Sequence, residues 1–148
     1  MKEFVVHHVI DSDKELDSLK AFLRSNNLPA EDVSLNNGLF LAYYNTQEVL
    51  VGSGGLEFYN NLALLRSLAV SPELRGQQVG KEIVSQLLEA AKQRGISEVY
   101  LLTQTASFFF QKMGFKPVAR ENVPDAIQKS SEFITVSPAS ADVLLLKL

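Results

Sequence analysis

A glycine-containing turn lies between a strand-like run and a helix-like segment, and its residues have the chemistry to bind an anion. Residues 62–70 are almost continuously apolar, and residues 80–94 place apolar side chains at helical spacing. The turn between them ends in Arg75, Gly76, Gln77, Gln78, Val79 and Gly80. Backbone N–H groups of such a turn point outward, and the helix dipole adds positive potential. The arrangement therefore predicts a site for a diphosphate.

Two basic side chains, Arg75 and Lys81, flank this turn. A helix dipole disfavours each positive charge at its N-terminus by roughly 0.3–1 kcal/mol, so the pair favours a bound anion. The turn is not a dinucleotide GxGxxG motif, because only Gly76 and Gly80 are glycines, and no Walker A Gly-Lys-Ser/Thr follows. The alternative is a tight strand-to-helix turn that needs glycine for steric reasons.

Apolar periodicity predicts a mixed α/β fold in one domain over residues 1–148. Antiparallel hairpins come first. The strand 62–70, the helix 80–94 and the strand 99–102 then form a right-handed crossover between parallel neighbours. The other predicted elements are strands at 4–10, 39–44, 49–58, 115–119 and 142–148, a helix capped by Asp11 and Ser12, a helix at 106–113 and a helical turn at 124–129.

Composition excludes several kinds of site. The chain has 148 residues, is 46% hydrophobic and carries a net charge of −3, so no global field favours nucleic acid or an anionic membrane. It has no cysteine, which excludes disulfides and thiolate chemistry and fits a cytoplasmic location. His7 and His8 alternate along the first strand without matching ligands nearby, so we expect no metal site.

The turn and its context resemble the acetyl-CoA signature of the GNAT superfamily of N-acetyltransferases. That signature reads Arg or Gln, two residues, Gly, one residue and then Gly or Ala, between a strand and a helix. The stretch TQTASFFFQKMGF at 103–115 resembles a second family segment. The resemblance covers residues 52–115 and implies the GNAT fold, a mostly antiparallel sheet with a central parallel pair, and acetyl-CoA as co-substrate. The cofactor-binding residues that it implies are Leu68, Ala69, Val70, Arg75, Gly76, Gln77, Gln78, Val79, Gly80, Lys81, Thr103 and Phe110.

Three residues depart from the family pattern. Gln78 replaces a glycine of the signature and brings a side chain to the pyrophosphate approach. Thr103 stands where many members have an asparagine near the pantetheine arm. Phe110 stands where many have a tyrosine that protonates the leaving thiolate, and a phenyl ring has no proton to give. The candidates for a substitute acid are Tyr43, Tyr44, Tyr59 and Tyr100, among which the sequence does not choose.

Longer runs refine the resemblance. The segments GLEFYNNLALLRSLAVSPELRG and LLTQTASFFFQKMGF are similar to acetyltransferases encoded in arsenic-resistance clusters, and the second also resembles the acetyltransferase domain of N-acetylglutamate synthase. Both imply an N-acetyltransferase whose acceptor is a small, amino-acid-like primary amine that attacks the thioester directly. The alternative is a catalytically weak acyl-CoA-binding or regulatory domain. We expect a monomer or homodimer with no nucleic-acid or membrane partner.

Glu57 is the predicted catalytic residue, the base that takes the proton of the amine, directly or through a water. It lies near the end of the strand 49–58, and the hairpin that follows brings it beside Leu64 and Arg66. General-base help of this kind contributes about 10²–10⁴ in rate. The alternative role for Glu57 is a solvent-facing edge residue or an ion-pair partner of Arg66.

Arg66 is the charged residue within an otherwise apolar strand. A buried guanidinium without a partner is strongly disfavoured, so Arg66 must meet a carboxylate or reach a cleft. One interpretation is a substrate-binding clamp on a carboxylate of the acceptor. The other is a structural pair with Glu57, Glu132 or Asp125, and the sequence leaves both open. For the thioester, we expect a backbone N–H near residues 68–70 to polarise the carbonyl.

Overall fold

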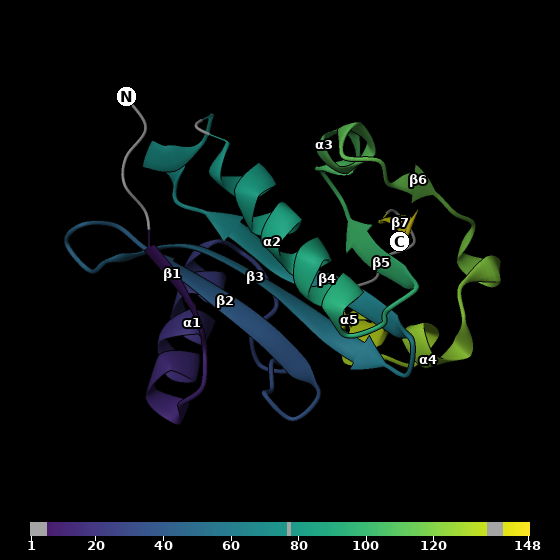
Figure 1. Cartoon of the computed structure of the whole chain (residues 1–148), viewed down its shortest axis with the longest axis horizontal. Helices are drawn as coiled ribbons and strands as arrows, with labels where there is room; N and C mark the ends of the chain where they lie inside the picture. The colour runs from purple at the N-terminus through teal and green to yellow at the C-terminus, as the bar shows by residue number, and fades with distance from the viewer. Residues whose placement is uncertain (1–5, 77, 136–140) are drawn as a thin grey trace.

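A mixed β-sheet runs through the molecule, as the computed structural model in Figure 1 shows. The structure describes residues 6–76, 78–135 and 141–148, and within them seven strands follow the order β1-β2-β3-β4-β5-β7-β6. The β4–β5 pair is parallel and the other pairs are antiparallel, which confirms the predicted fold class. The strands are β1 (Val6–Val9), β2 (Gly38–Tyr44), β3 (Leu50–Tyr59), β4 (Leu62–Val70), β5 (Glu98–Thr103), β6 (Lys116–Pro117) and β7 (Asp142–Lys147).

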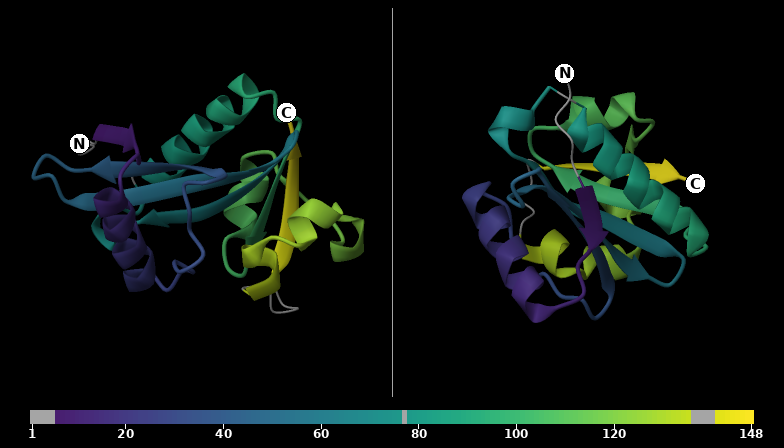
Figure 2. Two further views of the ribbon diagram at one scale, coloured as in Figure 1. Left: turned by 90° about the horizontal axis from the view of Figure 1, so that it is seen from below. Right: turned by 60° about the vertical axis from the view of Figure 1, so that its left-hand side comes forward.

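The two long helices cover opposite faces of the sheet, as Figure 2 shows. Helix α1 (Asp13–Ser25) begins where the Ser12 side chain accepts a hydrogen bond from the Glu15 N–H, as the predicted cap requires. Helix α2 (Val79–Gln93) is the crossover between β4 and β5. The short helices are η1 (Pro72–Leu74), α3 (Ser107–Lys112), η2 (Arg120–Asn122), α4 (Asp125–Gln128) and α5 (Ser131–Thr135).

Helix α2 buries the apolar stripe that its sequence spacing predicts. Ile83, Val84, Leu87 and Ala91 are fully buried against the sheet. A residue every three or four positions faces the same side of a helix, so this stripe anchors the whole element. The N-terminal end of α2 is thereby fixed beside the end of β4.

Two glycines of β3 let the sheet approach its neighbours closely. A Cβ atom at Gly54 would lie 2.5 Å from Ile83 Cγ2, and one at Gly55 would lie 2.3 Å from Phe40 Cδ1. Both distances are far below van der Waals contact. The hydrogen side chain of each glycine is therefore what allows α2 to sit on one face of β3 and the Phe40 ring on the other.

The structure departs from the sequence prediction mainly after residue 114. The predicted strand 115–119 is reduced to β6, because the Phe115 N–H bonds back to the Phe110 carbonyl and closes α3 instead of joining the sheet. Helix α5 was not predicted at all. Its Phe133 side chain packs with Ile127, Val123 and Leu64 in a buried apolar cluster.

The close packing at Gly54 gives a testable expectation for stability. Gly54→Ala should lower the free energy of unfolding by about 1–3 kcal/mol, because its methyl group overpacks against the branched Ile83 side chain. Gly80→Ala is the matched control. Its Cβ would come no closer than 3.6 Å to Phe109, so helix propensity should raise stability by up to about 1 kcal/mol. Urea denaturation measures both, and an unchanged Gly54→Ala midpoint would contradict the packing argument.

Candidate active site

The site begins where β4 and β5 separate. The two strands pair in parallel as far as Leu64 and Tyr100. Beyond this point β4 continues to Val70 and β5 to Thr103 without pairing to each other. Two parallel strands that diverge leave space between their carboxyl ends, and ligands of open α/β sheets bind at such a crevice.

A bulge in β4 lies at this opening. Gly55 pairs with Arg66 and Ser53 with Ala69, so two residues of β4, Ser67 and Leu68, stand opposite Gly54 alone. Ser67 has a φ of 60°, and its carbonyl accepts a 2.8 Å hydrogen bond from Ser53 Oγ. A bulge leaves a residue out of the ladder and turns its backbone groups outward. This is the segment expected to present a backbone N–H to a thioester.

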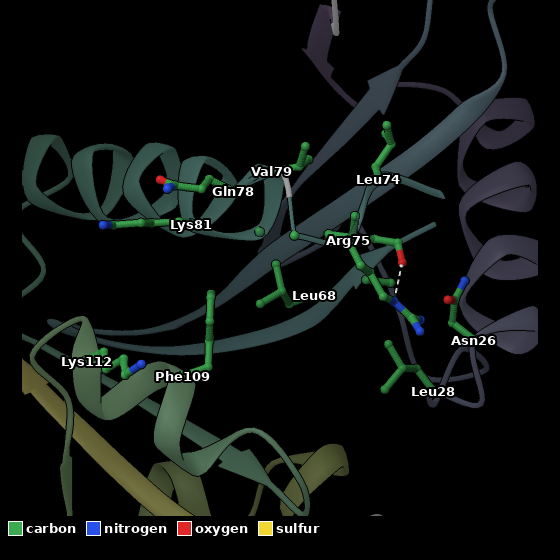
Figure 3. Close-up of a pocket in the computed structure, with 14 residues that line it drawn as sticks. Asn26, Leu28, Leu68, Leu74, Arg75, Gln78, Val79, Lys81, Phe109 and Lys112 are labelled. Atoms are coloured by element: carbon green, nitrogen blue, oxygen red, sulfur yellow. Dashed lines mark hydrogen bonds between the residues drawn. The ribbon is translucent and has the colours of Figure 1, made fainter. Parts of the chain in front are cut away.

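A cavity of about 640 Å³ occupies the N-terminal end of α2, shown in Figure 3. Arg75, Lys81 and Lys112 contribute three positive charges to its lining, and Lys112 comes from α3 across the opening. Arg75 Nε also donates a 3.2 Å hydrogen bond to the Val70 carbonyl, which holds the turn against the end of β4. The predicted cofactor residues that line this cavity are Leu68, Ala69, Val70, Arg75, Gly76, Gln78, Val79, Gly80 and Lys81.

The backbone of the turn is bent through the left-handed region at two positions. Gly76 has a φ of 87° and Gln78 a φ of 65°, and Gln78 is the N-cap of α2. A residue with a Cβ is disfavoured there by roughly 1–2 kcal/mol, which accounts for the glycine usual at this position of the signature. The Gln78 side chain is exposed and lies beside α2, away from Arg75, in Figure 3. Gln77 lies outside the described residues.

A second cavity of about 510 Å³ adjoins the first and fills the gap between the strands. The two share Asn26, Leu28 and Leu68. The second cavity also contains Thr103 and Phe110, the two remaining predicted cofactor residues that the structure describes. Its lining therefore runs from the cationic end, past the bulge, into the body of the protein.

Arg66 lies at the inner wall of this second cavity with a fully buried side chain. Its Nη1 and Nη2 donate to both carboxylate oxygens of Asp32 at 2.6 and 2.8 Å. Nη1 also donates to Glu57 at 2.9 Å, and Nε lies 3.0 Å from Glu132 Oε2. Of the structural partners that the sequence offered, Glu57 and Glu132 are realised. Asp125 is instead exposed at the start of α4, and Asp32 was not anticipated.

Both oxygens of Glu57 are engaged within the protein. Oε1 accepts a 2.9 Å hydrogen bond from the Tyr59 hydroxyl, and Oε2 accepts from Arg66. Glu57 is 5% exposed and is absent from the lining of the two cavities. Its role as the base stays a prediction, and this geometry favours the alternative, an ion-pair partner of Arg66. The substrate clamp by Arg66 likewise stays a prediction, with its guanidinium already bound to carboxylates.

The carboxylates around Arg66 have different electrostatic states. Hydrogen bonds from Arg66 hold the pKa of Asp32 below its usual range. Burial raises the pKa of Glu132 to about 7, and the negative charges of Glu57 and Asp32 add to this rise while Arg66 opposes it. The pKa values of these two acids therefore shift in opposite directions. For Asp32 the contacts with Arg66 outweigh the effect of desolvation, whereas for Glu132 desolvation outweighs the attraction of Arg66.

Comparison with known proteins decides the family. A model of the acetyltransferase (GNAT) family matches residues 6–115. The chain belongs to this family. An uncharacterised N-acetyltransferase of Chlorobaculum tepidum is 35% identical over 89 residues, which are 60% of this chain and 56% of the relative. An amino-acid acetyltransferase of Aeromonas salmonicida is 32% identical over 63 residues, 43% of this chain and 14% of that enzyme. The chain thus spans little more than half of the first relative and a small part of the second.

Solved GNAT structures share the fold across the chain. An acetyltransferase of Staphylococcus aureus superposes with a TM-score of 0.74 at 20% identity and covers 97% of this chain and 99% of its own. N-acetylglutamate synthase of Neisseria gonorrhoeae, complexed with coenzyme A and N-acetyl-glutamate, gives a TM-score of 0.77 at 18% identity. It covers all of this chain and 36% of its own. The comparison with these structures shows a shared fold.

Two of the four tyrosines that could replace the acid missing at Phe110 are hydrogen-bonded to carboxylates, whereas the buried Tyr43 hydroxyl has no hydrogen-bond partner among the described residues. Tyr59 donates to Glu57, and Tyr100 donates to Glu98 at 3.1 Å. Burial raises the pKa of Tyr43, Tyr59 and Tyr100 to about 12. The four candidate tyrosines are all absent from the lining of the two cavities.

Two negative findings concern the described residues alone. In residues 6–76, 78–135 and 141–148 there is no group of three His, Asp or Glu side chains placed to hold a metal ion. The helices of this same part of the chain include none with the length and apolar content needed to span a bilayer.

The left-handed backbone at Gln78 predicts a stabilising substitution. Gln78→Gly should raise the free energy of unfolding by about 0.5–1 kcal/mol, since relief of strain exceeds the entropy that glycine loses on folding. Gln86→Gly, at an exposed position within α2, is the control and should lower it by about 1 kcal/mol. Equal losses in the two variants, measured by urea denaturation, would show that Gln78 is unstrained.

The raised pKa of Glu132 predicts a pH dependence of stability. The folded pKa of about 7 exceeds the usual value of 4.5 for a glutamate, so between these values the folded chain binds a proton that the unfolded chain does not. The contribution of Glu132 is therefore fully present below about pH 4.5 and falls by up to roughly 3 kcal/mol as the pH rises through 7. Glu132→Gln should remove this fall. Denaturation of both proteins from pH 5 to 8 measures it, and parallel curves would contradict it.

Proposed function

We propose that the chain is an acetyl-CoA-dependent N-acetyltransferase that acetylates the primary amine of a small acceptor. The observation that carries this proposal is the pair of adjoining cavities at the β4–β5 opening. One is cationic and lies at a helix N-terminus, and the other leads from the β4 bulge to buried polar groups. A long thioester donor and a compact acceptor need such a two-part site, with the reacting atoms meeting at the junction.

The cationic cavity suits the diphosphate of coenzyme A. Backbone N–H groups at the start of α2, with Arg75, Lys81 and Lys112, would bind its phosphates. The pantetheine arm would then follow residues 68–70 to the bulge, where a backbone N–H stabilises the oxyanion that develops on the thioester. Thr103 and Phe110 border the second cavity and would lie beside the thioester end.

The reaction would proceed by direct attack. The amine nitrogen bonds to the thioester carbonyl carbon, the carbon–sulfur bond breaks, and coenzyme A leaves as the thiolate and takes a proton from solvent or an unidentified donor. The chain has no cysteine to form an acyl-enzyme. Holding the two substrates in line supplies much of the lowering of the barrier. The chemistry left to side chains is removal of a proton from the amine.

An amino-acid-like acceptor is the finer part of the proposal. It is supported by the relatives named amino-acid acetyltransferases and by the neighbour complexed with N-acetyl-glutamate. The second cavity also offers neutral polar side chains, those of Asn27, Gln104 and Thr105, which can hydrogen-bond a carboxylate. With these groups to bind the substrate carboxylate, Arg66 can remain paired with Asp32, Glu57 and Glu132.

Calorimetry with acetyl-CoA, followed by a thiol-release assay with amines, tests this function. Wild type should bind acetyl-CoA and release thiol in the presence of L-glutamate, L-methionine, L-lysine or benzylamine. Lys81→Ala should weaken acetyl-CoA binding by about 3- to 30-fold through loss of a charge-assisted contact. Lys92→Ala, an exposed lysine at the other end of α2, should leave binding unchanged.

Two results would contradict the proposal in different ways. Tight acetyl-CoA binding without amine-dependent thiol release would favour the alternative, an acyl-CoA-binding or regulatory domain, for which Gln78 and Phe110 are the motivation. Absence of acetyl-CoA binding would reject both functions. Equal effects of Lys81→Ala and Lys92→Ala would remove the α2 N-terminus as the phosphate site.

A further inference from the structure

We propose that Glu132, on the unpredicted helix α5, is the residue that accepts the proton of the acceptor amine. The proposal rests on the proposed function, since it assigns a residue to that reaction. It differs from the sequence prediction, which placed the base at Glu57. Three observations carry it. They are the position of Glu132 in the second cavity, which is called the acceptor cavity below, the contacts of the competing carboxylates, and the charges that face Glu132.

Glu132 shares a cavity with the segment where the thioester would react. It lines the same 510 Å³ space as Ser67 and Leu68 of the bulge, and its side chain is 9% exposed. Among the charged side chains that the structure describes, only Arg66 and Glu132 line this space. Of the described residues that line the cavity, Glu132 is therefore the one carboxylate that an amine could reach.

The competing carboxylates are held elsewhere. Glu57 has its two oxygens bonded to Tyr59 and Arg66, and Asp32 has its two oxygens bonded to Arg66. Both are absent from the lining of the acceptor cavity. The recorded ion pair of Glu132 uses one oxygen, Oε2, toward Arg66. Among the described residues no ion pair engages the other oxygen, Oε1, which is therefore the atom available to an incoming ammonium group.

The charged groups around Glu132 come from three other parts of the chain. Arg66 of β4 favours its ionised form, whereas Glu57 of β3 and Asp32 of the segment before β2 disfavour it. Together with burial they raise the pKa of Glu132 to about 7. A base works best when its pKa lies near the working pH, because it is then both deprotonated and able to hold a proton.

The acceptor enters as R–NH₃⁺, and one proton passes from nitrogen to the Glu132 carboxylate. The neutral amine attacks the thioester carbon, a carbon–nitrogen bond forms, and the carbon–sulfur bond breaks. A second proton leaves nitrogen to solvent as the intermediate collapses, and the thiolate takes one proton from solvent. When Glu132 returns its proton to solvent, one ammonium and one thioester have given one amide, one thiol and one proton.

The pH dependence of kcat in Glu132→Gln tests the proposal, with the fastest amine of the panel above as acceptor. In wild type, kcat should rise with pH through an apparent pKa near 7, and this rise is the limb of the pH profile that the variants test. Glu132→Gln should lose this limb and about 10²–10⁴ in kcat, with acetyl-CoA affinity unchanged. Glu132→Asp keeps a carboxylate and should retain the limb at a lower rate.

Glu57→Gln is the discriminating variant. Removing its negative charge should move the limb to lower pH, because that charge raises the pKa of Glu132. Hydroxylamine, whose nitrogen is already unprotonated at neutral pH, needs no base before attack. Its rate should therefore be far less sensitive to Glu132→Gln than that of the panel amine.

The outcomes separate this proposal from the proposed function. An unchanged pH profile in Glu132→Gln, or loss of the limb in Glu57→Gln alone, overturns the assignment while leaving the acetyltransferase function intact. An equal loss with hydroxylamine and with the panel amine shows a structural role and also overturns it. Absence of thiol release from wild type with every acceptor rejects the function and the assignment together. Thermal melting of each variant confirms that it is folded.

Discussion

The ion pairs of the buried Arg66 guanidinium are the interactions on which the second cavity depends. Arg66 lies on β4 and joins Asp32 before β2, Glu57 on β3 and Glu132 on α5. A charge with no exposed surface is tolerated only when its hydrogen-bonding groups are matched, and removing one partner of such a pair typically costs 3–5 kcal/mol, about half the stability of many domains. Four segments that are distant in the sequence are therefore held at one point.

The two halves of the site are built in different ways. The cationic half comes largely from one stretch, residues 68–81, in which the end of β4, the turn and the start of α2 follow each other directly. The second cavity is assembled from β4, β5, the end of α1 and the segment around Glu132. A cofactor site of the first kind follows from local chain geometry. A cavity of the second kind depends on several segments that are distant in the sequence, so a change in any one of them alters its lining.

Two of the left-handed backbone positions lie at the two ends of the site. Ser67 in the bulge and Gln78 at the N-cap of α2 both have left-handed φ values, and neither is a glycine. Such conformations persist because the surrounding structure holds them. At Ser67 the hydrogen bond from Ser53 to its carbonyl fixes the bulge, and at Gln78 the buried stripe of α2 fixes the helix that follows. The sheet thus holds the left-handed backbone of Ser67, and helix α2 holds that of Gln78.

The sequence by itself determined the elements with strong periodicity and the turn between them. The strand 62–70, the apolar face of α2 and the cationic turn were all predictable, because side-chain spacing and helix-end chemistry act over a few residues. It also showed that Arg66 needed a carboxylate, with Glu57 and Glu132 among the candidates.

Tertiary structure alone decided how those carboxylates are used. Asp32 stands in no periodic pattern, and the short helix α5 has too few residues for its periodicity to show. Which acid lines the acceptor cavity, and how far its pKa moves, depend on distances and burial among segments far apart in the chain. Electrostatic energy follows those distances, and they exist only once the sheet and its covering helices have formed.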